Sequence, residues 1–224
     1  MLYKFFRLNE NSVSAISQFC LYASKPLRFN DPFEGWCQIE GVSDQIGLPD
    51  LVHRYRERRG VICFSDRWKQ KNPIYNTLMW SHYADSHKGF CIEFKDEIKD
   101  TLKKSSDYIF HNWVQYSTPP EMPLSATGYE LDPILTKDSC WKDEHEFRFI
   151  FKKEGLFPFG SKEDNNINAI YLGTEFQNNN QALKDELLQF IKDNKIKCYQ
   201  QIKSHNTYIL QSQEILDFPS NKNN

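Results

Sequence analysis

The segment 144–151, EHEFRFIF, constrains the fold more than any other stretch of the chain. Glu144, Glu146 and Arg148 fall on one parity, and His145 and three phenylalanines fall on the other. Side chains of a strand alternate between its two faces, so the pattern predicts a strand with a charged face and an aromatic face. Two interpretations follow. The charged row is the solvent-facing side of an antiparallel sheet, or Glu144 and Glu146 form a catalytic pair beside a cleft.

The length of 224 residues suits one well-packed core better than two full domains. We therefore expect a single domain over residues 1–218 and a disordered tail over 219–224. The hydrophobic patterns predict strands at 2–6, 60–65, 88–94, 108–116, 144–151, 168–173, 196–204 and 208–215. They predict helices at 9–21, 49–59, 76–86 and 178–194, the first capped by Asn11 or Ser12. Because strands and helices rarely alternate after residue 108, the expected class is α+β.

The charge and cysteine content indicate the surroundings of the protein. A net charge of −2 gives no overall basic field for nucleic acid, although four arginines between residues 54 and 59 can form a local basic track. Six cysteines occur without a CxxC pair, which favours free thiols in a reducing compartment. No apolar run is long enough to span a bilayer. We therefore expect a cytoplasmic protein with no membrane partner.

The stretch 29–34, FNDPFE, predicts a rigid turn, because Asn30 and Asp31 precede a proline. Such a loop can present backbone N–H groups to a phosphate, and Phe33 can stack on an adenine or nicotinamide ring, with Arg28 close by. The alternative is a structural Asx turn that plugs the core with the rings of Phe29 and Phe33.

The helix expected at 76–86 combines aromatic and polar side chains. Met79 and Trp80 are expected to pack on a sheet. Ser81, His82 and Tyr83 carry polar groups that need partners when buried, which favours a place beside a cleft.

Four stretches, taken in order, resemble the signature of a prokaryotic family of unknown function, domain-of-unknown-function family 2971. They are FNDPFE, MWSHYADSHKGFCIEF, the set Lys137, Trp141, Glu144, Glu146 and Arg148, and AIYLG. The resemblance runs from Tyr3 to about Gly173. The family name implies no activity.

The arrangement also resembles the ADP-ribosyltransferases, whose fold is a split antiparallel sheet that grips NAD in a cleft. The resemblance implies that Tyr3 takes the position of the first-strand residue, which is His, Arg or Tyr in those enzymes. Ser65 takes the middle-strand position, with Tyr83 as an alternative, and Glu146 takes the position of the later glutamate. Neither His nor Arg stands at the first position in this chain.

The implied reaction breaks the nicotinamide–ribose bond of NAD, which builds positive charge on the sugar. Glu146 would stabilise that charge as the catalytic carboxylate, and Glu144 would accept the proton of the attacking group. Arg148 would pair with a pyrophosphate or neutralise Glu146. The residues expected to bind NAD are Tyr3, Lys4, Arg28, Asn30, Asp31, Phe33, Ser65, Ser81, His82, Tyr83 and Arg148.

The expected partners are NAD and a macromolecular acceptor such as RNA or DNA, in a toxin or phage-defence role that implies an antitoxin. Two other functions compete with this one: a non-catalytic module that binds a ligand or partner, and a magnesium-dependent nuclease that uses Asp31, Glu93 and Glu146. No resident metal is expected. Cys63, His82, His87 and Cys91 lack the spacing of a zinc site.

Overall fold

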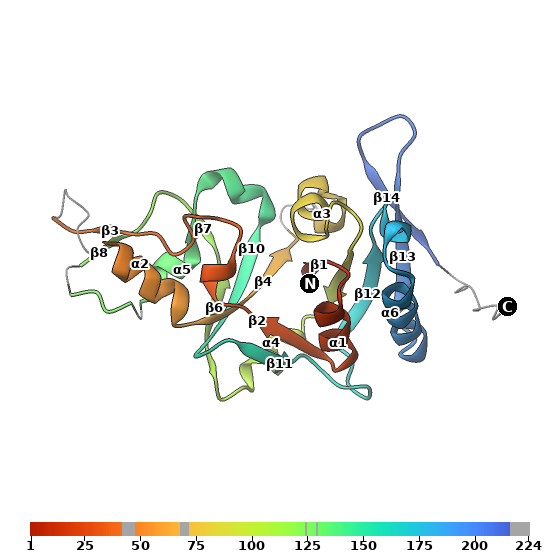
Figure 1. Cartoon of the computed structure of the whole chain (residues 1–224), viewed down its shortest axis with the longest axis horizontal. Helices are drawn as coiled ribbons and strands as arrows, with labels where there is room; N and C mark the ends of the chain where they lie inside the picture. Colours follow the sequence, from red (N-terminus) through yellow and green to blue (C-terminus); the bar gives the residue numbers. More distant parts are fainter. Residues whose placement is uncertain (42–47, 68–71, 124, 129, 216–224) are drawn as a thin grey trace. The chain divides into compact units, whose positions relative to one another are not determined.

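The structure is a computed structural model, and it describes residues 1–41, 48–67, 72–123, 125–128 and 130–215 (Figure 1). The chain divides into two compact units. The first unit comprises Met1–Cys20, Asp66–Thr101 and Pro158–Asn224, and the second comprises Leu21–Ser65 and Leu102–Phe157. The single domain expected over 1–218 stays a prediction, and the tail expected at 219–224 lies outside the described residues.

The first unit contains strands that lie in the order β14-β13-β12-β5-β1. Their bounds are β1 (Leu2–Phe6), β5 (Phe90–Phe94), β12 (Ile167–Leu172), β13 (Lys197–Lys203) and β14 (Leu210–Glu214). Neighbours are antiparallel except β12 and β13, which are parallel. Helix α6 (Gln181–Asp193) connects that parallel pair, as such a crossover requires.

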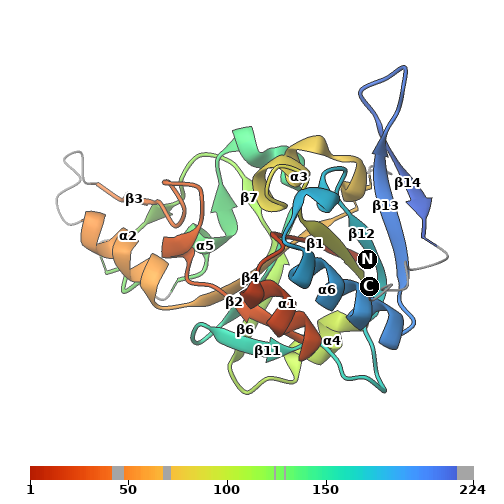
Figure 2. The same ribbon diagram turned by 45° about the vertical axis from the view of Figure 1, so that its right-hand side comes forward.

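Helices cover the strands of the first unit, and α1 and α6 lie side by side (Figure 2). The remaining helical segments are α1 (Glu10–Ser17), η2 (Pro73–Tyr75), α3 (Thr77–Tyr83), α4 (Ile98–Lys103) and η4 (Phe176–Asn178). The expected N-cap of α1 is wrong. Asn9 is the cap, because its side chain accepts from the backbone of Ser12 at 2.9 Å while Ser12 Oγ accepts from the Asn9 backbone at 3.1 Å.

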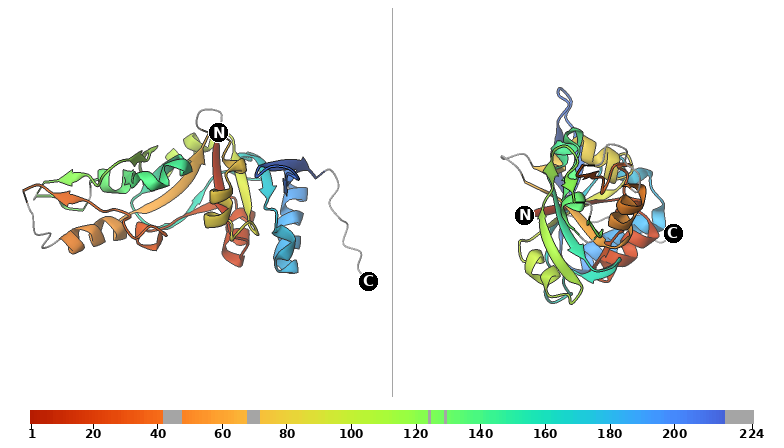
Figure 3. Two further views of the ribbon diagram at one scale, coloured as in Figure 1. Left: turned by 90° about the horizontal axis from the view of Figure 1, so that it is seen from above. Right: turned by 90° about the vertical axis from the view of Figure 1, so that its left-hand side faces the viewer.

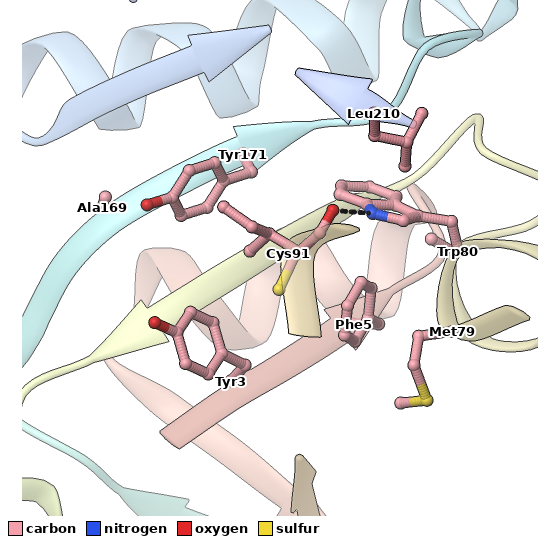
Figure 4. Close-up of a cluster of buried hydrophobic side chains, with 10 residues drawn as sticks. Tyr3, Phe5, Met79, Trp80, Cys91, Ala169, Tyr171 and Leu210 are labelled. Carbon is pink, nitrogen blue, oxygen red and sulfur yellow. Dashed lines mark hydrogen bonds between the residues drawn. The ribbon is translucent and has the colours of Figure 1, made fainter. Parts of the chain in front are cut away.

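One buried cluster of the first unit lies on one face of its strands (Figure 4). Met79 and Trp80 of α3 are buried in it, as expected, and Trp80 Nε1 donates to the Ile74 carbonyl oxygen at 2.8 Å. The hydroxyl oxygens of Tyr3 and Tyr171 lie at the end of this cluster away from Trp80 (Figure 4).

The second unit contains three antiparallel strands in the order β4-β10-β6. They are β4 (Gly60–Asp66), β10 (Glu146–Phe151) and β6 (Tyr108–Trp113). Short strand pairs accompany them: β2 (Cys20–Ala23) with β11 (Gly155–Pro158), β3 (Gln38–Ile39) with β8 (Glu121–Met122), and β7 (Gln115–Tyr116) with β9 (Thr136–Lys137). The helical segments are η1 (Pro26–Arg28), α2 (Leu48–Glu57), α5 (Asp132–Leu135) and η3 (Ser139–Glu144).

The α+β class is confirmed, since helices and mainly antiparallel strands occur in both units (Figure 3). The parallel pairing of β12 with β13 departs from the purely antiparallel arrangement that was expected.

Candidate active site

Strand β10 delivers two charged side chains into the interior of the second unit. All six of its residues are buried, with Arg148 at 0% and Glu146 at 6% exposure. Phe147, Phe149 and Phe151 are buried as well, which confirms the predicted aromatic face. The interpretation of the charged row as a solvent-facing side is therefore wrong. Glu146 and Arg148 need partners inside the protein, because burying an unpaired charge is costly.

Glu144 does not belong to the strand, although the sequence pattern places it there. It ends η3, and His145 follows with a left-handed φ of +46°, so β10 begins only at Glu146. A left-handed residue turns the chain sharply, which breaks the alternation before Glu146. The predicted strand over 144–151 is therefore wrong at its first two residues. Glu144 and Glu146 nevertheless both form ion pairs with the same lysine, Lys137.

Arg148 binds two carboxylates with its guanidinium group. Its Nε donates to Glu146 Oε1 at 2.8 Å and its Nη2 to Glu146 Oε2 at 2.9 Å. Nη2 also donates to Glu34 Oε2 at 3.1 Å, and Nη1 donates to Glu34 Oε1 and to the Ile134 carbonyl oxygen. These five contacts match the five N–H groups of a guanidinium. Arg148 thus neutralises Glu146, which was one of its two expected roles.

Lys137 connects the remaining carboxylates. Its Nζ lies 2.6 Å from Glu144 Oε2 and 3.6 Å from Glu146 Oε2, and 4.4 Å from the centre of the Trp141 ring. The Lys137 side chain is only 3% exposed. The motif residues Lys137, Trp141, Glu144, Glu146 and Arg148 therefore meet in one cluster, in which Trp141 is half-buried and the four charged residues are buried.

The cluster sets the protonation of its members. Burial alone would raise the pKa of Glu146, but Arg148 and Lys137 lower it to about 2. Burial raises the pKa of Glu34, and Arg148 offsets this only in part. Burial would lower the pKa of Lys137, but Glu146 and Glu144 raise it. Glu146 is therefore ionised at neutral pH.

Ser65 on β4 lies directly opposite Glu146 on β10. It is buried, and its Oγ donates to the Glu144 carbonyl oxygen. On the other side, Tyr116 of β7 accepts from the Glu146 backbone N–H at 2.8 Å. Two of the positions that the resemblance assigns, Ser65 and Glu146, are thus neighbours on adjacent strands.

The FNDPFE loop contains the Asx turn that was one alternative. Asp31 is buried, and its Oδ1 accepts from the Phe33 backbone N–H at 2.9 Å. Phe33 is 62% exposed and packs edge-on against Trp36, so it does not plug the core. Phe29 is half-buried, with its ring centre 5.5 Å from the Arg148 guanidinium carbon. The loop also supplies Glu34, which the sequence-based prediction missed.

Arg28 and Asn30, also expected to bind NAD, lie at the surface of the second unit. Arg28 Nη1 pairs with Glu154 Oε2 at 2.7 Å and donates to Tyr22 Oη at 3.2 Å, so it does not join the Arg148 cluster. Asn30 is exposed.

Tyr3 belongs to a second polar group, at the core of the first unit. Its hydroxyl donates to Glu93 Oε1 at 2.7 Å, and Tyr171 donates to Glu93 Oε2 at 2.8 Å. Arg67 Nη2 donates to the Tyr3 oxygen at 3.2 Å. Burial and Glu93 raise the pKa of Tyr3 above its usual range, so it acts as a neutral donor. Lys4 faces the other side of the strand, with its Nζ 5.6 Å from the Phe6 ring centre.

The polar residues of α3 have the following surroundings. Ser81 is exposed, and its Oγ donates to the Thr77 carbonyl oxygen at 2.9 Å. His82 is exposed, and Tyr83 packs partly against the core cluster. The predicted site residues in the first unit are Tyr3, Lys4, Ser81, His82 and Tyr83. Those in the second are Arg28, Asn30, Asp31, Phe33, Ser65, Glu144, Glu146 and Arg148.

Two members of the cluster, Glu34 and Lys137, received no role from the sequence alone. Both lie inside motifs that had been singled out, because Glu34 ends FNDPFE and Lys137 begins the motif that contains Glu146. That membership was the available signal. What the sequence does not reveal is that the two motifs meet in space.

The described residues contain no group of three or more His, Cys, Asp or Glu side chains that could hold a metal ion, so Asp31, Glu93 and Glu146 form no such group. Of the helices within the described ranges, none combines the length and the apolar character that a membrane crossing needs.

Comparison with known proteins gives one match. No curated protein and no solved structure matches the chain. The model of one family, described as "Protein of unknown function (DUF2971)", matches residues 79–149. This span includes the MWSHYADSHKGFCIEF stretch and all five residues of the motif from Lys137 to Arg148. It excludes FNDPFE and AIYLG, so it is shorter than the span from Tyr3 to Gly173 that was expected. The match confirms the predicted resemblance to this family over residues 79–149.

Proposed function

We propose that this protein is an ADP-ribosyltransferase-like enzyme that takes ADP-ribose from NAD and transfers it to a macromolecule. The observation that carries the proposal is the Glu146 carboxylate, which is ionised, held in place by Arg148 and opposite Ser65 on the neighbouring strand. The fold of this enzyme class, the NAD-binding role of Tyr3 and a toxin or phage-defence role belong to the same proposal.

The state of Glu146 suits the chemistry. When the bond between ribose C1′ and the nicotinamide nitrogen breaks, its electron pair leaves with nicotinamide and positive charge develops on the sugar. A carboxylate that stays ionised and cannot rotate stabilises this charge without reorganising during the reaction. Arg148 occupies one lone pair on each Glu146 oxygen, and a carboxylate has about four. A remaining lone pair accepts the ribose 2′-hydroxyl.

Glu144 completes the transfer. The acceptor forms a bond to C1′ and loses a proton, and Glu144 receives that proton as general base. Lys137, which contacts both carboxylates, keeps Glu144 and Glu146 on the same side of the reacting sugar. Arg148 and Lys137 are positioning residues in this scheme.

The test is incubation with labelled NAD and mixed acceptors, namely protein, RNA and DNA. We expect nicotinamide release and labelled acceptor with the wild type and neither with Glu146→Gln. The matched control is Glu130→Gln. Glu130 is another carboxylate of the second unit with a pKa of about 2, although burial would raise it, because the Thr127 and Gly128 backbones and Tyr55 hydrogen-bond it. Activity lost equally in both variants would attribute the effect to folding. A wild type that neither releases nicotinamide nor gains thermal stability with NAD would refute the proposal.

One observation favours a second candidate, a non-catalytic binding module. The charged motif residues engage one another inside the second unit, as they would if their task were to hold the fold around a ligand surface. The same incubation separates the two functions. A binding module would show a thermal shift with its ligand and no nicotinamide release.

A further inference from the structure

A hollow of about 630 Å³ lies beneath the hairpin that joins β13 to β14 in the first unit. It is lined by residues 203–210 of the hairpin together with Thr77 of α3 and His87. The hairpin, coloured blue, extends beyond the rest of the first unit (Figures 1 and 3).

The chemistry of the lining favours an anionic group. Several hydrogen-bond donors line it: the Lys203 ammonium group, the His205 imidazole, the Asn206 amide and the hydroxyls of Thr77, Ser204 and Thr207. None of the residues that line the hollow, all of them within the described ranges, is acidic. Side chains of this kind supply most of the contacts that proteins make to the phosphates of nucleic acid.

Lys203 can exchange its partner for a phosphate. It pairs with Glu175 at 2.6 Å, but its side chain is 70% exposed. Exposed ion pairs contribute about 0–1 kcal/mol. A phosphodiester entering the hollow therefore displaces Glu175 at little cost.

His87 forms a rigid wall of the hollow. Asp85, Ser86 and His87 are three consecutive left-handed residues, with φ of +47°, +52° and +69°. The His87 ring is stacked on Trp80 at 6.2 Å, and Gly173 approaches so closely that an added Cβ would lie 2.0 Å from the His87 carbonyl oxygen. Non-glycine residues persist in this backbone conformation only when their surroundings hold them there.

The rim of the hollow carries an exposed aromatic side chain. Tyr208 is fully exposed and Ile209 is 58% exposed, both at the tip of the hairpin. A ring free on both faces offers a stacking surface to a base, and stacking beside a phosphate-binding groove is how single strands are held without sequence preference. A duplex hides its base faces and cannot use such a ring.

We propose that this hollow binds a phosphodiester of single-stranded nucleic acid while a neighbouring base stacks on Tyr208. This inference rests on the proposed function and deepens it, because it names single-stranded nucleic acid as the class of acceptor. Because binding needs neither NAD nor Glu146, it can be tested separately from ADP-ribose transfer.

The experiment measures fluorescence anisotropy of a labelled 12-nucleotide strand without NAD, with DNA, RNA and duplex arms. We expect the single strands to bind and the duplex to bind more weakly. Tyr208→Ala should weaken binding about 5-fold to 150-fold, the loss typical of one stacked base. Lys203→Ala should make the dependence of log K on log salt shallower by about 0.7, the value for one phosphate contact to a single strand.

The matched control is Lys153→Ala. Lys153 has the same 70% exposure and a similar ion pair, to Asp107 at 3.1 Å, but it lies in the second unit. Lys153→Ala should leave unchanged both the affinity for the single strand and the dependence of log K on log salt. The proposal is overturned if the wild type binds no single strand, if the duplex binds as well as the single strands, or if Tyr208→Ala binds like the wild type. Tyr208 has no packing to lose, so its variant should fold.

Discussion

Glu34 and Glu146 bind the same guanidinium group, yet their replacement should have unequal effects on stability. At Glu146 the attraction of Arg148 and Lys137 outweighs burial, and the pKa falls from 4.5 to about 2. At Glu34 burial outweighs the attraction of Arg148, and the pKa rises. We therefore compare Glu146→Gln with Glu34→Gln, which remove the same charge from the two sides of Arg148.

The magnitude follows from the linkage between proton binding and folding. A fall in pKa from 4.5 to about 2 corresponds to about 3 kcal/mol, since each tenfold change in proton affinity is about 1.4 kcal/mol. This contribution is fully present above pH 4.5, and it is lost as the pH falls toward about 2. The raised pKa of Glu34 has the opposite sign, because its ionised form at pH 7 destabilises the fold relative to its protonated form.

The assay is urea unfolding followed by tryptophan fluorescence at pH 7 and at pH 3. Glu146→Gln should lower the free energy of unfolding by about 3 kcal/mol at pH 7, and Glu34→Gln should lower it by less. The difference in the free energy of unfolding between Glu146→Gln and Glu34→Gln should be smaller at pH 3 than at pH 7. Glu163→Gln, at a fully exposed position, is the control and should behave as the wild type. An equal or larger loss for Glu34→Gln at pH 7 would refute the reasoning.

Three further predictions use the same unfolding assay. Lys137→Met leaves Glu144 without its ammonium partner inside the protein and should cost about 3–5 kcal/mol; a loss below that of an exposed ion pair would contradict it. Tyr171→Phe removes a hydrogen-bond donor from buried Glu93 and should lower the free energy of unfolding by about 2 kcal/mol. An unchanged urea midpoint would mean that this hydrogen bond contributes nothing to stability. Gly173→Ala places a Cβ 2.0 Å from the His87 carbonyl oxygen and should lower the free energy of unfolding by about 1–3 kcal/mol. A variant as stable as the wild type would show that the segments around Gly173 and His87 separate at no cost.

The sequence predicted most elements of the fold because their hydrophobic patterns are strong. Strand β1 has the expected bounds, and α6 lies inside the expected segment 178–194. Strand direction is a different matter. The parallel pairing of β12 with β13 follows from the path of α6 between them, and residue spacing within a strand carries no information about the direction of its neighbour.

The candidate site was predictable in its parts but not in its assembly. The motif around Glu146 identified residues that do meet, since Lys137, Glu144 and Arg148 all contact one another or Glu146. Glu34 lies 114 positions from Arg148, and no local pattern indicates a partner at that distance. The burial of the whole strand also escaped prediction, because alternation of charged and aromatic residues ordinarily marks a half-exposed strand.

The left-handed residue at His145 has a consequence for how the two acids flanking it can vary. Because the left-handed backbone of His145 turns the chain, Glu144 at the end of η3 and Glu146 at the start of β10 both reach the Lys137 ammonium group. Branched residues such as valine rarely adopt a left-handed backbone. The backbone conformation of His145 thereby governs whether that ammonium group meets one counter-ion or two, and a branched residue at 145 would change the electrostatics of Lys137 while leaving both glutamates in the sequence.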